Sequence, residues 1–207
     1  EIGEIAAGEV LVTFHESEDP SVETARWSGD SMILPRIPLR YDEWGIRKGW
    51  ATPLLIRMAA DVQLEPGKYE FLIRARAESR LWIDDTATLT TDPITYIPPN
   101  GEEPVTPVIE PPAPGVRPAG YHQQEKIGVV EIESAEPIRV VLDMIVGGPQ
   151  ARVETGEVGV AVRREGEEEE LFHVLTPVGR EQLLALTDAA IEPELKKIES
   201  RLAAYDD

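Results

Sequence analysis

A short segment early in the chain places aromatic rings beside carboxylates. It reads Tyr41-Asp42-Glu43-Trp44, and Trp50 follows six residues later. Aromatic faces next to a few hydrogen-bonding groups, carried on loops, are suited to holding sugars. The segment lies in a stretch rich in turn residues, so we expect these five residues to form a ligand site. The alternative for the two tryptophans is that they close one end of the hydrophobic core.

Motifs typical of enzymes and metal sites are absent from the sequence. The three histidines, His15, His122 and His173, share no metal-ligand spacing, and each is expected to be structural. There is no phosphate-binding glycine loop and no nucleophile elbow. The chain has no cysteine, which excludes a thiolate nucleophile and a CxxCH haem attachment. Carboxylates are too numerous to single out an acid–base pair, and we predict that the chain is not an enzyme.

The charge of the chain narrows the range of partners. Thirty-nine acidic residues against 20 basic ones give a formal net charge of −19. Such a surface repels phosphate backbones and anionic headgroups, so we expect neither nucleic acid nor a membrane as partner. Neutral glycans, cations and basic proteins remain possible. The sequence starts at Glu1 without a methionine, and we expect a fragment of a longer protein rather than a processed product.

Most of the chain has the texture of β-strands. In the segment 69–76, Tyr69, Phe71, Ile73 and Ala75 recur at period two, as in a half-buried strand. An acidic hairpin is expected around Glu165-Gly166. The other predicted strands are 10–14, 53–64, 80–84, 86–91, 127–133, 138–146, 157–164 and 170–175. We therefore predict an all-β fold, an antiparallel β-sandwich over residues 1–176.

Two segments depart from this texture. Residues 92–119 contain nine prolines and cannot run inside a sheet, so we expect an insertion over the surface, with a partner-binding PxxP segment as the alternative. In the C-terminal extension 177–207 the apolar period changes to three and four residues, which predicts a helix. Its stripe is expected to be buried on the sandwich or shared with a neighbouring copy. The stripe comprises Ile191, Leu195, Ile198, Leu202 and Tyr205.

The most specific block runs from Glu65 to Asp84 and reads EPGKYEFLIRARAESRLWID. It resembles the turn–strand–turn–strand core of the protective-antigen-type (PA-fourteen) carbohydrate-binding domain of bacterial toxins, yeast adhesins and glycosidases. The resemblance implies a jelly-roll-like sandwich and a sugar-binding role. It places Leu81 and Ile83 in the core. Trp82 points the opposite way, yet a large apolar residue in this sandwich type is also expected to be core.

The resemblance also bears on metal binding. Lectins of this family hold calcium with two adjacent aspartates in the turn after the first of these strands. Here Arg76 and Ala77 stand at those positions, followed by Glu78. Calcium needs a cluster of hard oxygen ligands, so the family's site is expected to be lost and the chain to carry no cofactor. If a metal binds at all, Asp84 and Asp85 are the better candidates, although Asp84 is expected to cap its turn.

A second resemblance covers nearly the whole chain. The order of GEVLV (8–12), WATPLLIR (50–57), RLWID (80–84), VLDMIVGG (141–148) and LTD (186–188) is similar to an accessory domain of large planctomycete proteins that carry c-type cytochrome domains. It implies an exported, periplasmic or surface-bound parent with haem elsewhere. The expected function is a non-catalytic polysaccharide-binding module. The alternative is a structural or docking domain that packs against neighbouring domains.

Overall fold

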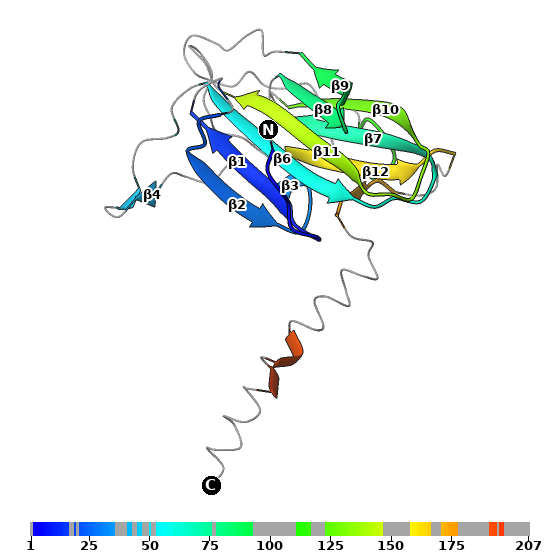
Figure 1. Cartoon of the computed structure of the whole chain (residues 1–207). Helices are drawn as coiled ribbons and strands as arrows, with labels where there is room; N and C mark the ends of the chain where they lie inside the picture. Colours follow the sequence, from blue (N-terminus) through cyan, green and yellow to red (C-terminus); the bar gives the residue numbers. More distant parts are fainter. Residues whose placement is uncertain are drawn as a thin grey trace. The chain divides into compact units, whose positions relative to one another are not determined.

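Two antiparallel β-sheets packed face to face form the larger of two units in the computed structural model (Figure 1). The units are Glu1–Pro177 and Val178–Asp207. The structure describes residues 2–16, 19, 21–35, 41–42, 45–46, 50, 53–75, 78–92, 111–116, 123–146, 158–166, 171–177, 191–193 and 195–196. Within these residues, no helix is long and apolar enough to cross a membrane.

The first sheet has six strands, and its centre is a long-range pairing. In spatial order they are β2 (Ala25–Gly29), β1 (Val10–His15), β6 (Leu54–Val62), β11 (Ile138–Val146), β8 (Ser79–Ile83) and β9 (Thr86–Thr91). The central pair sets Met58 of β6 opposite Leu142 of β11. β2 and β9 are the two edge strands.

The second sheet packs against one face of the first and has five strands. Its main path is β10 (Gln124–Ile132), β7 (Gly67–Ala75), β12 (Val158–Arg164) and β13 (His173–Val174). The short strand β3 (Ile33–Leu34) pairs with Val158 and Gly159, the start of β12. A separate two-stranded ribbon joins β4 (Tyr41–Asp42) to β5 (Gly45–Ile46).

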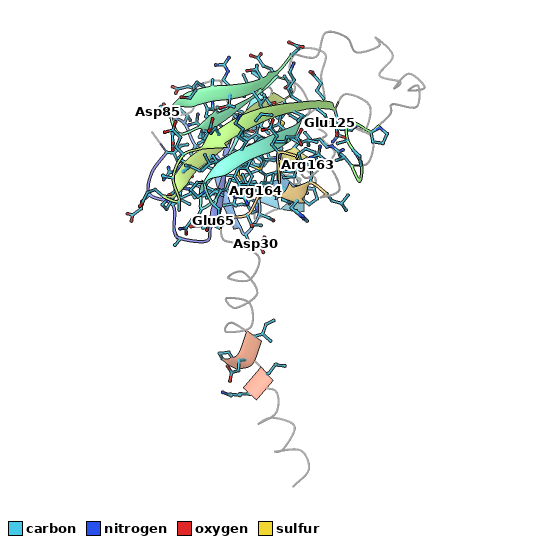
Figure 2. All side chains as sticks on the ribbon, turned by 90° about the vertical axis from the view of Figure 1, so that its right-hand side faces the viewer. Asp30, Glu65, Asp85, Glu125, Arg163 and Arg164 are labelled. Atoms are coloured by element: carbon cyan, nitrogen blue, oxygen red, sulfur yellow. The ribbon has the colours of Figure 1, made fainter. Side chains whose placement is uncertain are left out.

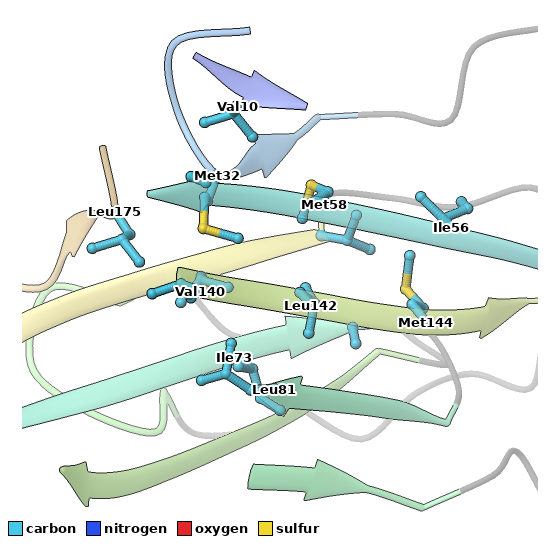
Figure 3. Close-up of a cluster of buried hydrophobic side chains, with 14 of the residues drawn as sticks. Val10, Met32, Ile56, Met58, Ile73, Leu81, Val140, Leu142, Met144 and Leu175 are labelled. Atoms are coloured by element: carbon cyan, nitrogen blue, oxygen red, sulfur yellow. The ribbon is translucent and has the colours of Figure 1, made fainter. Parts of the chain in front are cut away.

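The core lies between the two sheets, where alternate side chains of each strand meet (Figure 3). In β7 the core-facing residues are Tyr69, Phe71, Ile73 and Ala75, at the predicted period of two. Phe14 and Phe71 are fully buried. Each fully buried aliphatic or phenylalanine side chain contributes roughly 1.5–3 kcal/mol relative to exposure. Packing of this kind holds the sheets together without any disulfide, since the chain has no cysteine.

The sandwich is closed on the side of β9 and β10. A Cβ on Gly128 of β10 would lie 2.4 Å from Cδ2 of Leu89 of β9, so a larger residue there would force the leucine side chain to move. Beside it, the Gln124 side-chain amide both accepts a hydrogen bond from Asp92 N at 3.1 Å and donates one to Asp92 O. These contacts bring together the two ends of the segment 93–123, which contains most of the predicted proline-rich insertion.

A small apolar cluster covers the outer face of the first sheet. Ile5, from the chain before β1, packs on Leu11, Ala59 and Val141. Trp82 joins this cluster half-buried and is not part of the main core. Its predicted orientation, opposite to Leu81 and Ile83, is therefore right, whereas its predicted place in the main core is wrong. The N-terminal segment gives the Trp82 indole an apolar surface to pack on outside the main core.

The predicted fold class is confirmed: the chain is an all-β antiparallel sandwich with helical residues near its C-terminus. The predicted hairpin around Glu165-Gly166 is formed, with Val162 of β12 opposite His173 of β13. Four strands were missed inside a stretch read as turns: β2 and the two-residue strands β3, β4 and β5. The described helical residues are 191–193 and 195–196, where Ile191 and Leu195 of the predicted stripe are 47% and 52% exposed.

Candidate functional site

Tyr41 and Asp42, two of the predicted site residues, form β4 of the separate ribbon. Tyr41 pairs with Ile46 and Asp42 with Gly45, so the chain reverses between them. Glu43 and Trp44 stand at that reversal in the sequence but lie outside the described residues, as do the side chains of the β4 pair. The predicted ligand-binding role of these four residues therefore stays a prediction.

Trp50, the fifth predicted residue, is a core side chain. It is 8% exposed and belongs to the main hydrophobic cluster. Its ring stacks on that of Phe14, with centroids 5.0 Å apart and an interplanar angle of 13°. An indole buried in this way offers no open face to a sugar. The expected ligand contact is thus corrected to the alternative role, closing one end of the core.

Trp27, which the sequence analysis did not select, is partly exposed where Trp50 is buried. It is 40% exposed and stands on edge strand β2, opposite Val12 of β1. Its ring centroid lies 4.5 Å from that of Phe14 and 6.2 Å from that of Trp50, both in edge-to-face geometry. An edge strand has no outer neighbour to cover its side chains. The two buried rings therefore hold Trp27 in place while part of its indole stays in solvent.

The polar side chains of β2 alternate with Trp27 and point away from it, and they pair with residues outside β2. Arg26 donates two hydrogen bonds to the Glu23 carboxylate, at 2.9 and 2.7 Å. This pairing holds the pKa of Glu23 below its ordinary value. Ser28, on the same side of β2, donates to Glu9. Hydrogen bonds to a ligand stacked on Trp27 must therefore come from other segments.

The histidines do not form a metal site among the described residues. The His15 ring is 3% exposed, with Nδ1 3.0 Å from Val22 O and Nε2 2.9 Å from Thr13 Oγ1. These bonds account for its burial and confirm a structural role. His173 is exposed on β13, and His122 lies outside the described residues. In the part of the chain that the structure describes, no three histidines or acids gather closely enough to hold an ion.

Asp84 has the turn-capping role predicted for it. Its backbone takes a left-handed conformation with φ of 49°, and its N–H donates to Arg139 O at 2.7 Å. Its Oδ1 accepts a hydrogen bond from Arg139 N at 2.9 Å. The carboxylate therefore joins the β8–β9 turn to the start of β11, while Asp85 is exposed. Arg76 and Ala77 lie outside the described residues, so the predicted loss of calcium binding stays a prediction.

Solved structures of PA14 domains share this β-sandwich fold at low sequence identity. The chain matches the PA14 sugar-binding domain from an RTX adhesin with a TM-score of 0.52 and 9% identity, over 84% of this chain and 100% of that one. It matches the PA14 domain of the MpAFP antifreeze protein with a TM-score of 0.53 and 11% identity, over 86% and 93%.

A larger protein is also matched, and the sequence comparisons are negative. The β-glucosidase from Kluyveromyces marxianus aligns with a TM-score of 0.45 and 11% identity, over 77% of this chain; the chain spans 16% of that enzyme's length. No family model and no curated protein matches the sequence. At these identities the similarity establishes the fold, whereas the function must be argued from the site.

Proposed function

We propose that the chain is a non-catalytic polysaccharide-binding module of a larger exported protein. The observation that carries this proposal is Trp27, a partly exposed indole supported by two buried rings. The axial C–H groups of a pyranose pack on such a face. Because Phe14 and Trp50 already fix the ring, little side-chain entropy is lost when a sugar stacks on it.

The charge of the chain supports a neutral polysaccharide as the ligand. With a formal net charge of −19, the surface opposes the approach of acidic polymers, especially at low salt. The RTX adhesin domain, whose whole length is matched, is a sugar-binding domain, which makes the same activity a reasonable hypothesis here. In the proposed site Trp27 stacks on the sugar, and Tyr41, Asp42, Glu43 and Trp44 supply further stacking and hydrogen-bond acceptors. No metal or other cofactor takes part.

The proposed parent is extracytoplasmic, in the periplasm or on the cell surface. Its support is the resemblance, in the order of sequence segments, to accessory domains of planctomycete cytochrome-containing proteins, in which haem is bound by other domains. The two PA14 domains matched over nearly their whole length are compatible with a unit that is used as a module.

The test is a pull-down of the full chain on a panel of insoluble neutral polysaccharides, followed by titration of the best ligand. We expect binding that is lost in Trp27→Ala and weakened in Trp44→Ala. Val129→Ala is the matched control, because Val129 is 51% exposed on β10 in the other sheet. Failure to bind any glycan would refute the function. Full binding by Trp27→Ala would refute the site alone.

A docking domain is the second candidate, favoured by the exposed apolar residues Ile191 and Leu195. Exposed apolar groups on one side of a helix are often covered by another protein surface. In this case the chain would retain a neighbouring domain of its parent in a pull-down, and Ile191→Glu would release it. Retention of the neighbour combined with no glycan binding would favour docking over sugar binding.

A further inference from the structure

A cavity of about 200 Å³ opens on the outer face of the second sheet, away from the core. Its floor includes Leu72 of β7 and Ala161 of β12. Leu72 alternates with the core-facing Phe71 and Ile73, so it points out of the sandwich. Trp27 does not line this cavity, which is therefore separate from the candidate sugar site described above.

The floor belongs to an apolar row that crosses four neighbouring strands. Ile127 of β10 stands opposite Leu72, and Leu72 stands opposite Ala161. Ala161 in turn stands opposite Val174 of β13. Residues opposite one another in antiparallel strands share a face of the sheet, so these side chains form one strip about 14 Å long. Ala161 is the smallest member of the row, and a larger side chain there would fill the cavity.

One wall is the described piece of the proline-rich segment, residues 111–116. Gly115 takes a left-handed conformation, with φ of 76°, which favours glycine. A Cβ there would lie 2.2 Å from Cδ2 of Leu171, so the turn packs directly against the chain that leads into β13. Next to Leu171, Phe172 also lines the cavity, and the Arg163 guanidinium lies 4.5 Å from its ring centroid.

The polar groups around the cavity are already engaged. Arg74, the only charged residue among the described lining, donates through Nε to Glu125 Oε1 at 2.6 Å, and both side chains are buried. Val160 N donates to Met32 O, and Val160 O accepts from Leu175 N, each at 2.9 Å. In the part of the chain that the structure describes, no buried side-chain nitrogen or oxygen lacks a partner. A group that enters the cavity should therefore be apolar, because a polar one would give up its bonds to water without replacement.

Ion pairs flank the apolar row on both sides. Along β7, Arg74 with its partner Glu125 lies two residues after Leu72. Glu70 lies two residues before it and accepts a hydrogen bond from Arg163. In Figure 2, the labelled Glu125 and Arg163 come from β10 and β12, the strands on either side of β7. Each pair joins opposite charges, so these residues leave the row itself electrically balanced.

Exposed apolar side chains gather around the cavity. Among the described residues of the unit Glu1–Pro177, five large apolar side chains are exposed. Three of them, Val129, Leu171 and Val174, stand on the second sheet or on the cavity wall. An apolar cavity with apolar side chains around its mouth suits a protein partner that inserts one anchor residue.

The acidic charge of the chain determines which partner fits. Glu165 is exposed at the tip of the β12–β13 hairpin, and in the sequence four further glutamates, 167–170, come directly before Leu171. Together with the net charge of −19, they attract a basic partner and repel an acidic one. We propose that the cavity is a docking site for a basic segment of a partner protein, which inserts one phenylalanine side chain. The inserted ring packs on Phe172, while the basic side chains next to it stay in solvent.

The test is isothermal titration of the full chain with three peptides that are capped at both ends. The first, Lys-Lys-Phe-Lys-Lys, carries the anchor and the basic charge. The second has alanine in place of phenylalanine, and the third has glutamates in place of the lysines. We expect the first peptide to bind at least about tenfold more tightly than either of the others, and added salt to weaken it. Equal binding of the first and second would overturn the anchor, and equal binding of the first and third, or no binding at all, would overturn the basic partner.

Two variants locate the site. Ala161→Leu is expected to fill the cavity and weaken binding of the first peptide by at least about tenfold. Ala87→Leu is its matched control, because Ala87 is exposed on β9 of the other sheet, and it is expected to bind as wild type. Phe172→Ala, which removes part of the wall without overpacking, is expected to weaken binding as well. Wild-type affinity in both Ala161→Leu and Phe172→Ala would overturn the assignment.

The outcomes separate this docking site from the proposed sugar site. Trp27→Ala is expected to bind the first peptide as wild type does, because Trp27 does not line the cavity. A loss of peptide binding in Trp27→Ala equal to that in Ala161→Leu would overturn a separate docking site. Peptide binding that depends on Ala161 supports the docking site whether or not the chain also binds a polysaccharide.

Discussion

Replacing Trp50 by alanine is expected to destabilise the sandwich far more than the same change at Trp27. Trp50 is 8% exposed and stacked on Phe14, so its removal leaves a cavity in the main core. Truncation of a buried tryptophan costs about 3–5 kcal/mol. Trp27 is 40% exposed, so less of its contact is lost and water can fill the space; we expect about 1–2 kcal/mol.

The assay is thermal and urea unfolding, both followed by far-ultraviolet circular dichroism, because tryptophan fluorescence itself changes in these variants. At about 2–4 °C per kcal/mol for a unit of this size, Trp50→Ala should melt roughly 6–20 °C below wild type. Trp27→Ala should melt only about 2–8 °C lower. The slope of the unfolding free energy against urea should be unchanged, since the surface exposed on unfolding is nearly the same.

The result that would refute this reasoning is a Trp50→Ala variant within about 1 kcal/mol of wild type. It would mean that Trp50 is not part of the packed core, and it would restore Trp50 as a candidate stacking face. The double variant Trp27→Ala/Trp50→Ala adds a check. Because the two rings are in edge-to-face contact, the losses of unfolding free energy in the single variants should differ from additivity by about 0.5–1.5 kcal/mol. Because Trp27→Ala is expected to remain folded, it is the variant in which lost sugar binding can be attributed to the site.

Three further predictions concern the turn, an ion pair and calcium. Asp84→Ala should lower the free energy of unfolding in urea by about 1–2 kcal/mol, because Arg139 N–H loses its acceptor and alanine is strained in a left-handed conformation. Asp84→Asn keeps an acceptor oxygen and should stay near wild type. Equal losses in the two variants would exclude the hydrogen bond as the cause. Arg26 lowers the pKa of Glu23 in the folded chain, so this stabilisation is present above the ordinary glutamate value and is lost as pH falls through the lower folded pKa. Thermal melts should therefore separate Glu23→Gln from wild type at neutral pH and not in strong acid; a gap that persists in acid would contradict this. Calcium in millimolar excess should leave the melting temperature unchanged, and an increase reversed by chelator would contradict the predicted loss of the family's site.

Strands with strong apolar alternation were predictable from the sequence. The segment 138–146 was predicted with the bounds it has, since it turns one row of residues toward the core. β2 escaped because an edge strand needs no apolar row. Its five residues are partly or fully exposed, and it is held mainly by hydrogen bonds to β1, which leave no periodic trace in the sequence.

The candidate sites were less predictable than the fold, for a physical reason. An indole suits both a core and a stacking site, so the roles of Trp27 and Trp50 depend on whether a neighbouring strand covers them. The core role of Trp50 follows from its stacking on Phe14, a residue that lies far from Trp50 in the sequence. The cavity likewise depends on the register of Leu72 with Ala161, residues from separate parts of the chain. No local pattern contains that information.

The contact between Gln124 and Asp92 lies where the segment 93–123 leaves and rejoins the sandwich. The two hydrogen bonds tie the ends of the segment 93–123 together at the rim of the sandwich. Doubling the length of such a tethered segment costs only about 0.6 kcal/mol in closure entropy. The same segment contributes Gly115 and Val116 to the cavity wall. Related chains could therefore change what they bind by exchanging this one segment, much as an antibody changes specificity in its loops while its sandwich stays the same.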